Sequence, residues 1–177
     1  MTAYLINVGG TGAKCAEAFL HLAMAGFAPP EIELALVDPD SANGNLAETR
    51  LLASSYRDLH QLWRSGVHLL PAQSKLCASR LGNCSVFSPI SAAFPNLATL
   101  LDVGALDPKL LQPLIEAMFH CDPEAERSEV HVSNAVGFRG VPAIGATAMS
   151  ATLDPALPFW ADLTRDLSAP GINPVRV

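Results

Sequence analysis

The chain has 177 residues, of which half are hydrophobic and 16% are charged, and its mean hydropathy is +0.28. This length suits one domain with a sizeable core, while the low charged fraction predicts faces that other parts of a longer protein cover. The net charge of −6 argues against nucleic acid or an anionic membrane as a partner, because phosphate-rich surfaces are bound by excess Lys and Arg.

We expect a cytoplasmic protein. No apolar run reaches the roughly eighteen residues that a membrane span needs, and the N-terminus lacks the basic region of a signal peptide. The four cysteines form no C-x-x-C pair and the five histidines form no H-x-x-x-H pattern, so we predict no metal site from them.

The first forty residues predict one βαβ unit. Residues 3–8 (AYLINV) are typical of a short buried parallel strand, and residues 11–25 have the apolar spacing of a helix that ends near Gly26. Residues 32–40 (IELALVDPD) predict a second strand that ends in acids. We therefore expect a three-layer, Rossmann-like α/β domain with a mostly parallel sheet and right-handed crossovers.

The middle of the chain has a weaker pattern. We predict a helix in the second half of residues 45–66, a short extended piece over 66–75, and a loop with one short helix over 82–107. Residues 108–121 predict a helix opened by a proline. No linker or repeat divides the sequence, so residues 1–177 are predicted to form one domain without an internal boundary.

The stretch LINVGGTGAKC, residues 5–15, predicts an anion site. Gly9, Gly10 and Gly12 let backbone N–H groups approach an anion closely, and the following helix directs its positive end to the same place. Thr11 is either a hydroxyl donor to a phosphate or an N-cap, and Lys14 is either a phosphate counter-charge or a solvated side chain.

Acids and amides follow the second predicted strand. Asp38 and Asp40 either hydrogen-bond a ribose or form a turn beside Pro39. Asn43 and Asn45 are either sugar or phosphate contacts or part of an Asn-Gly turn. The residue types alone are compatible with each of these alternatives.

The glycine turn matches two known phosphate motifs only in part. Gly10-Thr11-Gly12 supplies the first half of the dinucleotide fingerprint G-x-G-x-x-G, but its third position falls on Cys15, and Asp38 lies farther along than the usual twenty residues or so. The P-loop pattern G-x-x-x-x-G-K-[ST] is absent.

Three segments, in the right order, resemble the tubulin and FtsZ family. The first segment is the strand, glycine-rich turn and helix with which that family also begins. Residues 37–46 (VDPDSANGNL) then resemble its N-T-D-A-Q-x-L segment, with Asp40 at the aspartate and Leu46 near the closing leucine. Residues 137–149 (GFRGVPAIGATAM) resemble the FtsZ stretch G-x-G-A-G-x-x-P-x-x-G. The chain is similar to divergent bacterial tubulin-like proteins.

The resemblance implies a GTP- or GDP-binding module, with Mg²⁺ as a companion ion and self-assembly in the intact protein. It adds Gly137, Arg139 and Gly140 to the expected nucleotide contacts, since an arginine among glycines can make charge-assisted bonds to phosphate. The signature G-G-G-T-G-[ST]-G is absent. We therefore expect a truncated, N-terminal part of a longer protein, with the catalytic acids elsewhere and any GTPase activity confined to the intact protein.

Two other classes remain as alternatives: an NAD(P)- or FAD-binding Rossmann oxidoreductase domain, and a nucleotide-free scaffold. The last residues, 172–177 (INPVRV), predict the opening of a further strand. An unpaired strand and apolar faces favour self-association or contact with the remaining domains of a longer chain.

Overall fold

The computed structural model describes residues 2–40, 42–65, 74–88, 95–102, 105, 112–119, 129–131, 133 and 142–169. The chain forms two compact units. The first unit contains Met1–Val37, Ala42–Phe87 and Asp154–Val177, and the second contains Asp38–Ser41 and Ser88–Leu153.

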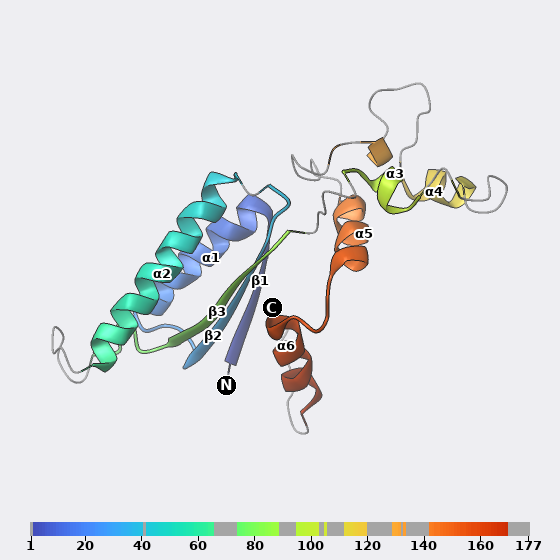
Figure 1. The fold of residues 1–177 in the computed structure, drawn as a ribbon. Coiled ribbons are helices and arrows are strands. Elements are labelled where there is room, and N and C mark those ends of the chain that lie inside the picture. Colours follow the sequence, from blue (N-terminus) through green and yellow to red (C-terminus); the bar gives the residue numbers. More distant parts are fainter. Residues whose placement is uncertain are drawn as a thin grey trace. The chain divides into compact units, whose positions relative to one another are not determined.

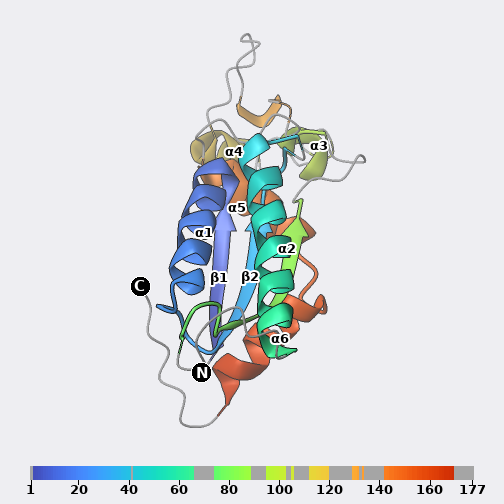
Figure 2. The same ribbon diagram turned by 90° about the vertical axis from the view of Figure 1, so that its left-hand side faces the viewer.

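The first unit is built on a parallel sheet of three strands, β1 (Thr2–Val8), β2 (Glu31–Val37) and β3 (Arg80–Phe87), in the order β1-β2-β3. Leu5 lies opposite Leu34 in the β1–β2 ladder, and the three strands run in the same direction (Figure 2). The parallel sheet predicted from the apolar runs is confirmed.

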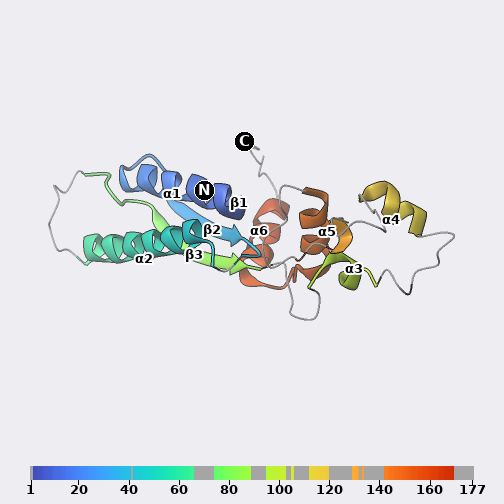
Figure 3. The same ribbon diagram turned by 90° about the horizontal axis from the view of Figure 1, so that it is seen from above.

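Helices cover both faces of this sheet. Helix α1 (Gly9–Met24) and helix α2 (Gly44–Arg64) lie on one face, and α6 (Pro158–Ser168) lies on the other (Figures 1 and 3). The first unit is therefore a three-layer α/β structure compatible with a Rossmann-like fold. The predicted strand, glycine turn, helix and strand are all present.

The main core fills the layer between the sheet and the helices α1 and α2. Alternate side chains of β2 point into it because successive residues of a strand face opposite sides. They meet apolar positions that recur along the two helices. The core comprises Ala16, Leu20, Ala23, Ile32, Leu34, Leu36, Leu46, Ala53, Tyr56 and Leu81.

An aromatic cluster joins α6 to the opposite face of the sheet. Phe159 is 1% exposed and packs edge-on against Tyr4, with ring centroids 5.7 Å apart. It also contacts Phe87 and Trp160, at 6.1 Å and 5.0 Å between centroids. The Tyr4 hydroxyl donates to Asp166 Oδ2 at 2.7 Å, so one aromatic residue and one hydrogen bond tie the helix to β1.

The second unit is helical in its described part. Its elements are α3 (Leu97–Leu100), α4 (Gln112–Met118), a 3-10 turn (Glu129–His131) and α5 (Pro142–Thr152). They share a small apolar core made of Leu97, Ile115, Phe119, Val130 and Ile144.

Two predictions for the middle of the chain need correction. The loop predicted over 82–107 is wrong at its start, where β3 occupies residues up to Phe87; its Gly-Asn-Cys-Ser centre carries little strand propensity. The predicted short helix within that range is confirmed as α3. The predicted second-half helix in 45–66 begins earlier, because Asn43 acts as an N-cap and accepts from Asn45 N–H at 3.0 Å.

Other predictions fall wholly or partly outside the described residues. The extended piece predicted over 66–75 is described only at its last two positions, and residues 172–177 are not described. Of the proline-opened helix predicted over 108–121, α4 accounts for Gln112–Met118. Among the described residues, no helix is long and apolar enough to cross a membrane.

We expect Tyr56→Phe to lower the free energy of unfolding by about 1 kcal/mol, because the fully buried Tyr56 hydroxyl donates to Ser79 O at 2.8 Å. Burial raises the pKa of Tyr56 from 10.0 to about 12. Below pH 10 the residue is neutral in both states and its contribution is complete. As the pH rises from 10 to about 12, the unfolded state ionises first and stability falls. Urea unfolding across this range should show a shallower decline in the variant; an identical decline would contradict the assignment.

Candidate functional site

The glycine turn lies where β1 ends and α1 begins. Gly9 adopts φ +69°, a left-handed conformation that favours glycine, and a Cβ placed there would meet nothing within 4 Å. Val8, the N-cap residue, provides no side-chain hydrogen bond, and the first turn of α1 carries no acid. The first N–H groups of a helix have no intrahelical acceptor, so this end of α1 is suited to an anion.

The other two glycines of the turn have packing roles within the protein. A Cβ on Gly10 would lie 2.8 Å from Asn43 Nδ2, and a Cβ on Gly12 would lie 2.8 Å from the backbone carbon of Asn7. Gly12 therefore allows α1 to approach β1 closely, and Gly10 makes room for an amide side chain. Gly9 is the glycine of the turn that faces open space.

The start of α2 meets the glycine turn of α1. The Asn45 side chain donates to Gly10 O at 3.4 Å, a long hydrogen bond. One turn further on, the fully buried Thr49 hydroxyl lies 2.9 Å from Ala13 O and 2.8 Å from Asn45 O. The structure thus brings Asn43 beside the glycines, as expected of residues of one site. The N-termini of α1 and α2 lie at the same end of the sheet, where β1 and β2 end.

Lys14 has other partners. Its ammonium lies 2.8 Å from Glu17 and 2.7 Å from Glu48, so it bridges the exposed surfaces of α1 and α2. Hydrogen bonds to these two carboxylates raise the pKa of Lys14. Contact between Lys14 and a phosphate stays a prediction, and the two carboxylates already neutralise the ammonium.

Asp38 directly follows β2 and belongs, with Asp40, to the second unit. Asp38 is 4% exposed, and its carboxylate accepts from the Asp40 N–H at 2.9 Å. This is the turn chemistry that the sequence left as one of two alternatives. Contact of either acid with a ribose stays a prediction.

The third predicted segment is described only in part. Gly137, Arg139 and Gly140 lie outside the described residues. Pro142 opens α5, a position where its missing N–H costs nothing, and Gly145 lies within that helix.

Sequence reasoning missed Asn7, a polar residue on an apolar strand. Asn7 is 8% exposed and its side chain donates to Ala35 O at 3.3 Å, across the neighbouring strand β2. Its backbone is the surface against which Gly12 packs. An amide inside an apolar run immediately before a glycine turn was the available signal, since such a group needs a partner when it is buried.

Within the described ranges, no group of three or more His, Cys, Asp or Glu side chains could hold a metal ion. The Mg²⁺ implied by the resemblance usually binds through substrate phosphates and water with few protein ligands, and it stays a prediction.

Comparison of the chain with protein-family models, with curated proteins and with solved structures gives no match.

Proposed function

We propose that this chain is a nucleotide-binding module of the tubulin and FtsZ type, and that the phosphates of GTP bind at the glycine turn. The observation that carries the proposal is the N-terminus of α1, which follows β1 at Gly9 with a positive φ, no side-chain cap and no acid in its first turn. N–H groups left without acceptors at a helix N-terminus bind phosphate well.

The position of the turn supports the same proposal. Ligands of open parallel sheets bind outside the carboxyl ends of the strands, and β1 ends at this turn. The side chains of Asn43 and Asn45 lie beside Gly10 and place two amide groups at the same turn. The choice of GTP rests on the resemblance of the segments around Asp40 and Gly140 to the family.

A dinucleotide is the second candidate. Close packing of Gly12 on Asn7 is the kind of helix–strand approach that a dinucleotide fingerprint also needs, and Asp38 follows β2 directly. Calorimetric titration with GTP, ATP and NAD separates the two. The proposal expects saturable binding of GTP, weaker binding of ATP and no response to NAD. Tight NAD binding without a response to GTP would favour an oxidoreductase domain, and no binding of any would favour a scaffold.

Thr11→Glu is expected to weaken GTP binding at least tenfold without destabilising the protein. A carboxylate in the first turn of α1 repels phosphate, yet it interacts favourably with the helix dipole by about 0.3–1 kcal/mol. Thr11 is exposed, so either replacement fits. The matched control is Thr11→Gln, which has the same size without the charge and should keep most of the affinity.

Calorimetry on both variants, with thermal unfolding alongside, checks this prediction. Equal affinities for the Glu and Gln variants would place the phosphates away from α1.

We also expect negligible GTP hydrolysis by this chain alone, because phosphoryl transfer depends on groups that position and neutralise the outer phosphates.

A further inference from the structure

A hollow of about 440 Å³ lies in the first unit, away from the glycine turn. It is bounded by the second half of α2, the start of β3 and one residue of β2. The parallel strands place it near the amino end of β3, whereas the glycine turn follows the carboxyl end of β1. Its volume falls in the range of small-molecule sites.

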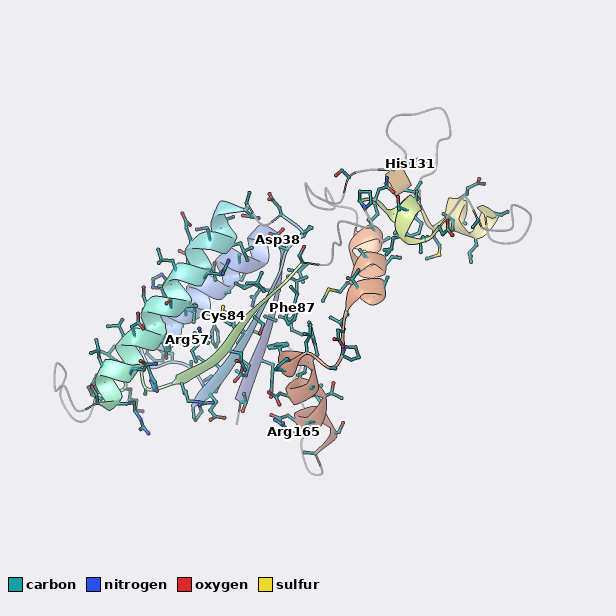
Figure 4. The ribbon with its side chains drawn as sticks, in the orientation of Figure 1. Asp38, Arg57, Cys84, Phe87, His131 and Arg165 are labelled. Atoms are coloured by element: carbon teal, nitrogen blue, oxygen red, sulfur yellow. The ribbon has the colours of Figure 1, made fainter. Side chains whose placement is uncertain are left out.

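The hollow gathers positive charge in a chain of net charge −6. Arg57 and His60 come from α2 and Arg80 comes from β3, whereas Glu33 is the acid among the lining residues. Figure 4 shows Arg57 on α2 beside the strand that carries Cys84. Burial raises the pKa of the Cys84 thiol, and the charges of Arg57 and Arg50 oppose that rise, so positive charge from α2 acts on β3.

The acid of the hollow is already engaged with the sheet. Glu33 Oε2 accepts from the Asn83 N–H at 2.7 Å, and the carboxylate lies against Gly82, where a Cβ would collide with it. The pairing of β2 with β3 shifts register between Ile32 and Leu34, so Glu33 stands at that irregularity. The carboxylate therefore has a structural role in the pairing of β2 with β3.

The two arginines retain donors for a ligand, and His60 is held by the backbone. Arg57 Nε and Nη2 donate to Gly82 O at 3.1 Å and 2.7 Å, which fixes a guanidinium that has five N–H donors. Arg80 lies 3.7 Å from Glu31, and both side chains are more than half exposed, so this ion pair is weak. His60 Nδ1 lies 2.8 Å from Cys77 O; a carbonyl only accepts, so Nδ1 carries the hydrogen, and Nε2 of the neutral ring is an acceptor for a hydroxyl of the ligand.

We propose that this hollow is a second binding site, for a small molecule that bears a phosphate group. A terminal phosphate carries nearly two negative charges and three acceptor oxygens, so it can accept from both Arg57 and Arg80. Succinate carries the same charge but divides it between two separated carboxylates of two oxygens each. The side-chain amides of Gln61 and Asn83 line the same hollow and supply neutral donors for the rest of the ligand.

Titration of the whole chain with inorganic phosphate, followed by amide chemical shifts in NMR at constant ionic strength, tests the proposal. Saturable shifts are expected over residues 57–61 and 80–83, and succinate should produce clearly weaker ones. Arg80→Gln is expected to weaken phosphate binding there by roughly tenfold, as loss of a charge-assisted hydrogen bond does. Arg80 is exposed, so the variant should fold.

The matched control is Arg165→Gln on α6, whose arginine pairs with Asp162 and which should leave phosphate binding unchanged. The proposal would be overturned by shifts confined to residues 9–13 or by an absence of saturable shifts. It would also be overturned by an equal loss of phosphate affinity in both variants, or by succinate binding as tight as phosphate binding. Thr11→Glu should leave the shifts over 80–83 intact, so this site and the nucleotide site can fail separately.

Discussion

Phe159→Ala is expected to lower the free energy of unfolding by about 3–5 kcal/mol, the usual cost of truncating a buried aromatic residue. Phe159 is 1% exposed and contacts the rings of Tyr4, Phe87 and Trp160. Its loss leaves a cavity and removes the main apolar contact between α6 and the sheet. The measurement is chemical unfolding, read by circular dichroism.

Leu167→Ala on the same helix is the matched control, because Leu167 is 52% exposed and its truncation should cost well under 1 kcal/mol. Tryptophan fluorescence supplies a second readout, since Trp160 lies 5.3 Å from the Phe87 ring and should become more exposed when α6 is loosened. Equal stability of the two variants would show that α6 contributes little to the first unit.

Gly12→Ala is expected to destabilise the protein by about 1–3 kcal/mol, the usual cost of inserting a methyl group into a packed contact. The new Cβ would lie 2.8 Å from the backbone carbon and 3.1 Å from the Cα of Asn7, and a backbone neighbour cannot rotate aside. The start of α1 must therefore move away from β1. Because the proposed phosphate site is the same turn, GTP affinity should fall as well.

Gly44→Ala is the control for this substitution. Gly44 is exposed and opens α2, and a methyl group added to it would meet nothing within 4 Å, so alanine there should be neutral or slightly stabilising. Thermal unfolding of both variants tests the predicted difference in stability. A Gly12→Ala protein as stable as Gly44→Ala would mean that α1 and β1 are less closely packed than the structure has them.

The first βαβ unit could be predicted because its signals are local. The apolar run of β1, the glycines and the helical spacing of α1 each indicate one element, and the structure has them at Thr2–Val8 and Gly9–Met24. β3 could not be recognised because Gly82 and Asn83 weaken its pattern. The place of these two residues in the strand depends on Glu33, a residue fifty positions away from Asn83, whose carboxylate accepts from Asn83 N–H.

The candidate site was predictable only in outline. The glycines marked the turn, but sequence alone could not show that Gly10 and Gly12 accommodate Asn43 and Asn7, since both contacts depend on how helices and strands pack. Nor could it show that Lys14 lies between Glu17 and Glu48, because the second of these acids comes from another helix.

The most direct test of the central proposal is a map of backbone amide shifts in NMR as GTP is added. Direct phosphate binding predicts that the largest shifts fall on the amides of residues 10–13, the first turn of α1, with a smaller response in the side chain of Asn45. Saturable GTP binding that leaves residues 9–13 unchanged would contradict the proposal, because the phosphates would then lie away from the glycine turn.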